Sequence, residues 1–119
     1  MSTRSVAQLF VDLCRQRKNF DVMQTLYSPD IVSVEGDGSQ TAGQKQVIDK
    51  SKRWAAVNTI HDEQVSGPFF NGDDEFAVHF RWDVTRKDSG ERTKLEEVAV
   101  YTVKDDHVVR ERFFYEGEW

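Results

Sequence analysis

The segment LYSPDIVSVEG, residues 26–36, decides the fold of this chain. Its first residues close a helical pattern, and Pro29 disfavours a helical conformation in the residue before it. Asp30 suits a turn, because its side chain can bond to nearby backbone. The alternating, β-branched run Ile31–Glu35 then predicts a strand. One carboxylate, Glu35, lies at the far end of that strand.

Two helices are predicted before this segment. Ser2 or Thr3 can cap the first helix, and Asn19 can cap the second. Apolar side chains recur in both at helical spacing. They form one stripe of Val6, Leu9, Phe10, Leu13 and Cys14, and a second of Phe20, Met23, Leu26 and Tyr27. We interpret Cys14 as a small buried hydrophobe rather than a nucleophile, because no basic or histidine context accompanies it.

A third helix and four strands are predicted after the segment. The helix starts at Thr41 or Gly43 and ends near Asn58, where the apolar period changes from helical to two. The predicted strands are residues 60–70, 74–86, 92–104 and 107–116. Their connections are short and polar, so consecutive strands should pair as antiparallel neighbours.

The two middle strands differ in their apolar pattern. One face of strand 74–86, expected to meet the core, consists of Phe76, Val78, Phe80, Trp82 and Val84. His79 then lies on the outer sheet face, whereas a bulge would reverse the phase and place it in a pocket. Strand 92–104 has apolar residues on both faces, which predicts a central strand covered on both sides.

Composition limits the class of protein. A length of 119 residues with 38% hydrophobic content is typical of one domain, residues 1–119. A net charge of −5 without a basic block disfavours nucleic acid as a partner. The single cysteine cannot form an internal disulfide. No apolar run suits a signal peptide or a membrane span, so we expect a cytoplasmic protein without a membrane partner. The histidine spacing matches no metal site, and no nucleotide fingerprint occurs, so neither metal nor cofactor is expected.

Three stretches carry a family resemblance: Leu26-Tyr27-x-x-Asp30-x-Val32-x-x-Glu35, the sequence YTVKDDHVV at 101–109, and residues 110–115. With the predicted order of elements, they resemble the SnoaL-like polyketide cyclases and the wider nuclear-transport-factor-2-like superfamily, which includes ketosteroid isomerase. The resemblance implies an α+β fold of α-α-β-α-β-β-β-β order. In it, a curved antiparallel sheet wraps the long N-terminal helix as a cystatin-like cone. It also implies a hollow that serves as the active site in enzyme members, and a homodimer formed through the outer sheet face.

Glu35 is the first catalytic candidate. In ketosteroid isomerases a tyrosine, followed three residues later by an aspartate, precedes the general base by eight residues. Tyr27, Asp30 and Glu35 reproduce that spacing. The isomerase positions for the two oxyanion donors fall near Phe10 and Ala99, which have no hydroxyl or acid, so steroid isomerisation by those residues is disfavoured. The donor would instead be Tyr101 or Tyr115. The alternative is that Glu35 is a solvated acid at a strand end.

Glu97 is the second catalytic candidate, because it shares a strand face with Tyr101. An acid inside a covered strand should be paired or protonated. The expected partner is Arg112 or Arg81, and a purely structural ion pair is the alternative to catalysis.

Aromatic residues exceed what a tight core of this size requires, so some should line a pocket. The residues expected to contact a ligand are Tyr27, Trp54, Phe80, Trp82, Phe113 and Tyr115. These features predict a pocket for a small apolar molecule. The protein would be a cofactor-independent isomerase, cyclase or dehydratase in which a pocket carboxylate acts as general base on an apolar carbonyl substrate. The alternatives are a non-catalytic ligand-binding domain and a structural dimerisation domain. The enzyme hypothesis requires Glu35 in a cavity, facing a hydroxyl or a protonated acid.

Overall fold

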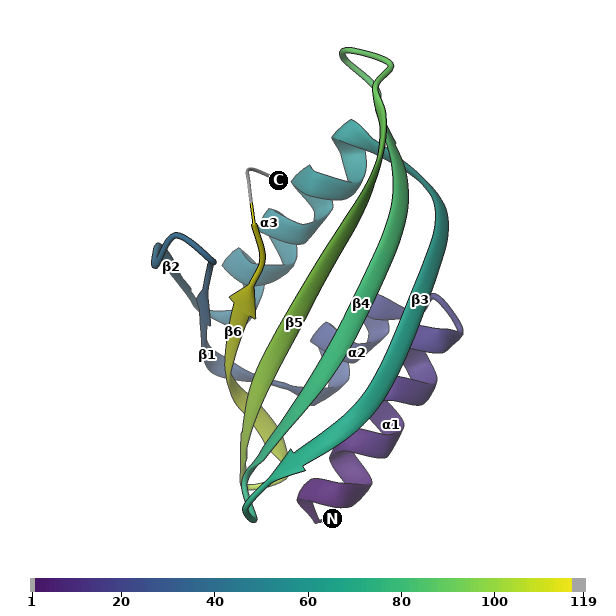
Figure 1. The fold of residues 1–119 in the computed structure, drawn as a ribbon. Coiled ribbons are helices and arrows are strands. Elements are labelled where there is room, and N and C mark those ends of the chain that lie inside the picture. The colour runs from purple at the N-terminus through teal and green to yellow at the C-terminus, as the bar shows by residue number, and fades with distance from the viewer. Residues whose placement is uncertain (1, 117–119) are drawn as a thin grey trace.

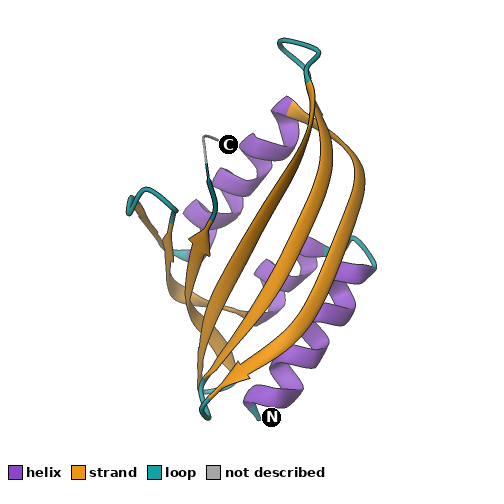
Figure 2. Cartoon of the chain, in the orientation of Figure 1, coloured by secondary structure: helices purple, strands orange, loops and turns teal. Residues whose placement is uncertain are grey.

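One strongly curved sheet and three helices, all on the same side of it, make up the part of the chain that the computed structural model describes, residues 2–116 (Figures 1 and 2). The six strands follow the order β2-β1-β6-β5-β4-β3. The elements are α1 (Thr3–Arg15), α2 (Asn19–Leu26), β1 (Tyr27–Val34), β2 (Gln40–Ala42), α3 (Gln44–Val57), β3 (Asn58–Asn71), β4 (Glu75–Arg86), β5 (Arg92–Lys104) and β6 (His107–Phe114). None of the helices in residues 2–116 is long and apolar enough to cross a membrane.

Helix α1 lies in the concave side of the sheet. Ser2 caps it, because the Ser2 hydroxyl accepts a hydrogen bond from the Ser5 amide at 3.1 Å. Cys14 is buried, as predicted. Leu9 is 39% exposed, so the prediction that it belongs to the apolar stripe of this helix was wrong. The buried positions are Val6, Ala7, Phe10, Val11 and Cys14, because the curved sheet contacts a slightly rotated face of the helix.

The junction between α2 and β1 differs from the prediction. The helix ends at Leu26, and Pro29 lies inside an extended segment instead of ending a helix at that point. Pairing of β1 with β6 shifts register between Tyr27 and Val32. The irregularity fits Pro29, which has no N–H to donate to a neighbouring strand. The predicted cap by Asn19 was also wrong, because its amide donates to Glu63 Oε1 at 3.1 Å instead.

Strand β1 pairs with β6 in parallel, and Ser33 lies opposite Glu111 in that pairing. The other pairs of the sheet are antiparallel. Parallel neighbours need a long connection, and here α3 and four strands lie between them. This pairing places β1, the first strand in the chain, beside β6, the last. The short strand β2, which pairs with β1, was not predicted.

The predicted faces of β4 are confirmed, because Phe76, Val78, Phe80 and Val84 are all buried. His79 lies on the outer face, where its Nε2 contacts Glu96 Oε1 at 2.6 Å. Strand β5 is central, between β4 and β6. It is covered on one side only in the single chain, since Val98 is 39% exposed. The prediction of cover on both sides was therefore wrong for the monomer.

Candidate active site

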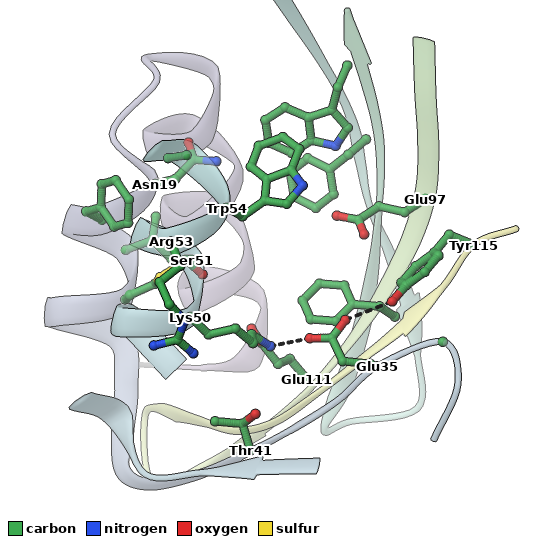
Figure 3. A pocket seen from close by; sticks show the side chains of 18 of the residues that line it. Asn19, Glu35, Thr41, Lys50, Ser51, Arg53, Trp54, Glu97, Glu111 and Tyr115 are labelled. Carbon is green, nitrogen blue, oxygen red and sulfur yellow. Dashed lines mark hydrogen bonds and ion pairs between the residues drawn. The ribbon is translucent and has the colours of Figure 1, made fainter. Parts of the chain in front are cut away.

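A cavity of about 1080 Å³ lies between the concave face of the sheet and the helices (Figure 3). It is large enough for a drug-sized molecule. The structure places all nine predicted site residues on its wall: Glu35, Glu97, Tyr101, Tyr27, Trp54, Phe80, Trp82, Phe113 and Tyr115. Their chemical roles remain predictions, but one cavity contains them all.

Aromatic rings form the wall of the cavity between α3 and β4. Trp54 of α3 meets Trp82 of β4 edge to face, with ring centroids 5.6 Å apart. Phe80, two residues before Trp82 on the same strand face, stacks on it at 5.6 Å. Such a surface favours flat apolar ligands, because stacked and edge-on aromatic contacts stabilise them beyond simple burial.

Glu35 lies at the end of β1 and points into the cavity (Figure 3). Its side chain is only 24% exposed. Lys50 of α3 forms an ion pair with one carboxylate oxygen, and the Tyr115 hydroxyl donates to the other at 3.0 Å. No role was predicted for Lys50. Its ammonium turns inward because two acceptors, Glu35 and Ser33, face it from β1.

Glu111 of β6 is 1% exposed and is the most deeply buried acid of the site. One of its carboxylate oxygens accepts from the Tyr27 hydroxyl, and the other accepts from the Ser33 hydroxyl at 2.7 Å. Burial raises the pKa of Glu111, while its two hydroxyl donors and the charge of Lys50 act in the opposite direction. The parallel pairing of β1 with β6 creates this contact.

Glu97 of β5 is 8% exposed and faces the cavity opposite Trp54 (Figure 3). Burial, followed by the negative charges of Glu111 and Glu35, raises the pKa of Glu97 to about 8. No hydrogen bond or ion pair joins its carboxyl to another residue within 2–116. Glu97 therefore holds its proton at neutral pH.

The arginine partners predicted for Glu97 were wrong. In the register of β4 and β5, Glu97 lies opposite Phe80 on the inner face, and Arg81 lies opposite Glu96 on the outer face. Arg81 accordingly contacts Glu96, at 3.7 Å. Arg112 lies over the Phe114 ring at 5.1 Å. The pleat of the sheet separates both cations from the acid, so the protonated alternative is the one the geometry favours.

Tyr27 and Tyr101 add two hydroxyl groups to the cavity wall. Burial raises the pKa of Tyr27 and that of Tyr101 well above the ordinary value, so both remain neutral donors. The Tyr101 ring packs on Phe10, with centroids 4.4 Å apart. Its hydroxyl has no hydrogen-bond partner among the described residues. Tyr101 can thus offer its proton to a ligand.

Ser33, Lys50 and Glu111 are the site residues that sequence reasoning missed. A signal existed for two of them: Ser33 shares a predicted strand face with Glu35, and Glu111 alternates with Phe113. Lys50 gave no signal, because it lies among other charged residues of α3. Within residues 2–116, no three His, Cys, Asp or Glu side chains converge as metal ligands would.

The chain belongs to the SnoaL-like family, because the model of the SnoaL-like domain matches residues 1–115. A protein from Mesorhizobium loti, described as a candidate SnoaL-like polyketide cyclase with carbohydrate phosphatase in brackets, has 36% sequence identity and a TM-score of 0.91. That match covers 97% of this chain and 100% of the other.

Two structures of lower identity share the fold. A candidate isomerase from Bacillus subtilis has 15% identity and a TM-score of 0.77, covering 98% of this chain and 90% of its own. A protein with a ketosteroid isomerase-like fold from Catenulispora acidiphila, in complex with trimethylamine, has 14% identity and a TM-score of 0.67. That match covers 80% of this chain and 72% of the other. A search of curated proteins finds no match. The predicted superfamily and the cone fold are confirmed.

Proposed function

We propose that this protein is a cofactor-independent enzyme that transfers a proton on an apolar, carbonyl-bearing small molecule, as an isomerase, cyclase or dehydratase does. One observation carries the proposal. Two carboxyl groups, Glu35 and Glu97, face the same cavity in different surroundings: Glu35 forms an ion pair with Lys50, whereas Glu97 is buried without a partner among the described residues and its pKa is raised to about 8. A paired acid and a buried acid with a perturbed pKa in one cavity are a mark of acid–base sites.

The two acids would act on opposite ends of the reacting group. Glu35, which contacts Lys50, removes a proton from the carbon next to the carbonyl. Glu97 or the Tyr101 hydroxyl donates a hydrogen bond to the carbonyl oxygen, which becomes negative as the proton leaves. The aromatic wall between α3 and β4 holds the apolar part of the substrate.

The relatives support a reaction of this class. The Mesorhizobium loti protein is described as a candidate polyketide cyclase, and the Bacillus subtilis protein as a candidate isomerase. The Catenulispora acidiphila protein is in complex with a small organic molecule, trimethylamine. Cyclisation and isomerisation both include proton transfer at carbon, for which an acid and a base in one cavity are suited.

A second candidate function is ligand binding without catalysis. Both oxygens of Glu35 already accept hydrogen bonds, from Lys50 and from Tyr115, so a substrate would have to compete with these donors for the carboxylate. In that case the same cavity would bind an apolar molecule and leave it unchanged.

Proton exchange at carbon separates these candidates. We would incubate the protein in D₂O with 2-tetralone, a bicyclic ketone, and follow loss of its α-proton signals by NMR. Glu35→Gln and Glu97→Gln should each slow the catalysed exchange by about 100-fold or more. Glu96→Gln is the matched control, because Glu96 neighbours Glu97 but lies on the outer face. Exchange no faster than in buffer, with 2-tetralone nonetheless bound, would favour the binding function.

We also propose that two copies of the chain associate through the outer face of the sheet. Val98 of β5 and Phe114 of β6 lie opposite each other in the strand register. Both are exposed, at 39% and 47%. Association would remove this apolar surface from water.

A further inference from the structure

An unbroken series of hydrogen bonds runs from the cavity rim into the buried core. It joins, in order, Tyr115, Glu35, Lys50, Ser33, Glu111 and Tyr27. Figure 3 shows the Tyr115, Glu35 and Lys50 part of this series on the cavity wall. The proposed reaction uses only the outer members, so the inner ones need a separate explanation.

The direction of each hydrogen bond in the series follows from chemistry. Lys50 has donors only, so the Ser33 hydroxyl must accept from it, at 2.7 Å. The Ser33 proton is then free for Glu111, at 2.7 Å. Glu111 therefore accepts at both oxygens, from Ser33 and from Tyr27, as an ionised carboxylate does.

The series contains two carboxylates but one ammonium. Lys50 pairs directly with Glu35 and reaches Glu111 only through the Ser33 hydroxyl. One negative charge thus remains in excess beside the cavity. Glu97 faces that charge from β5, and the charge favours the protonated form of Glu97.

We propose that Lys50 and Glu111 are positioning residues for the acid–base pair: Glu111, through Ser33, holds the Lys50 ammonium against Glu35, and all three groups share the cavity wall with Glu97. The inference rests on the proposed function, because it assigns the inner residues to the same reaction. Neither residue reacts with the substrate. Each acts by fixing the charge and orientation of a group that does.

The charged groups around Glu97 support this assignment. Burial is the largest cause that favours its protonated form; Glu111 of β6 and Glu35 after β1 add to it, and Glu63 of β3 adds a smaller effect of the same sign. Lys50 of α3 opposes them. Removal of Glu111 and removal of Lys50 should therefore move the titration of Glu97 in opposite directions.

The test is a titration of the Glu97 side chain by ¹³C-carboxyl NMR, with its signal assigned by its loss in Glu97→Gln. Glu111→Gln should lower the Glu97 midpoint by about one unit, and Lys50→Met should raise it by a similar amount. Lys50→Arg, which keeps the charge, should restore the midpoint. Tyr27→Phe removes a hydroxyl but no charge, so it should leave the Glu97 midpoint close to that of the unmodified protein.

Midpoints that stay unchanged in both charge variants, or that move in the same direction, would overturn the proposal. If Lys50→Met does not fold, as judged by circular dichroism, Glu111→Gln decides alone, because the amide keeps the shape of the acid. The titration needs no turnover. If the protein does not catalyse proton exchange on 2-tetralone but the Glu97 midpoints move in opposite directions, the positioning proposal holds and the proposed reaction is wrong.

Discussion

At the scale of single residues, Glu96 and Glu97 illustrate what determines the chemistry of a side chain here. They are adjacent on β5, yet Glu96 contacts His79 and Arg81 on the outer face, whereas Glu97 faces the cavity. The pleat alternates their directions. Two identical side chains thereby acquire different surroundings, and burial raises the pKa of Glu97 to about 8.

The raised pKa of Glu97 predicts a pH-dependent stability difference. The folded chain holds this proton up to about pH 8, whereas an unfolded chain releases it near the ordinary pKa of 4.5. Burial of Glu97 is therefore harmless below about pH 4.5, and its cost grows as the pH rises towards 8.

Glu97→Gln should thus stabilise the protein against urea at pH 8.5 relative to pH 4.5, by on the order of 4 kcal/mol. Unfolding free energies at both pH values would measure the effect, with Glu96→Gln as the control that should show none. A Glu97→Gln effect of equal size at the two pH values would contradict the assignment of this pKa.

At the scale of secondary structure elements, β4 shows how alternation separates core from surface. Phe76 is fully buried. Its ring centroid lies 5.4 Å from that of Phe10 and 5.1 Å from that of Tyr101. His79, three residues further on, lies on the outer face beside Glu96.

We expect Phe76→Ala to lower the free energy of unfolding by about 3–5 kcal/mol, since it removes a large side chain from a packed core. His79→Ala should change that free energy by no more than about 0.5 kcal/mol, because its contact is exposed. Urea titrations of the two variants test the faces assigned to β4. Equal losses in both would mean that the strand is covered on both sides.

At the scale of the whole molecule, the sheet separates two surfaces. Its concave side encloses the cavity with α1, α2 and α3. No helix of residues 2–116 covers its convex side (Figure 1). A second copy on the convex side would leave the cavity walls intact, because Val98 and Glu97 point to opposite sides of β5.

Light scattering coupled to size exclusion should give the mass of a dimer for the unmodified protein. Val98→Arg should give that of a monomer, because a buried, unpaired charge at the interface is unfavourable. Glu91→Arg, in the exposed turn before β5, is the control and should remain dimeric. Binding of 2-tetralone, followed by tryptophan fluorescence, should be unaffected by Val98→Arg. A monomer at every concentration of the unmodified protein would refute the proposed association.

Much of the fold and the outline of the site followed from local pattern. The period-two alternation of β4 identified its inner face, and that of β5 placed Glu97 and Tyr101 on one side of the strand, although which side lines the cavity stayed open. The spacing of Tyr27 and Glu35 drew attention to two residues that both lie on the cavity wall. Such features depend on neighbours in the chain, so they are visible in the sequence.

The order of the elements apart from β2, the family, and nine residues of the cavity wall could be predicted from the sequence alone. Only the tertiary structure decided how their polar groups pair. Parallel pairing of β1 with β6 places Ser33 opposite Glu111, and the crossing of α3 brings Lys50 to Glu35. Those contacts join residues far apart in the chain, and the burial that raises the pKa of Glu97 exists only once the sheet has curved around the helices.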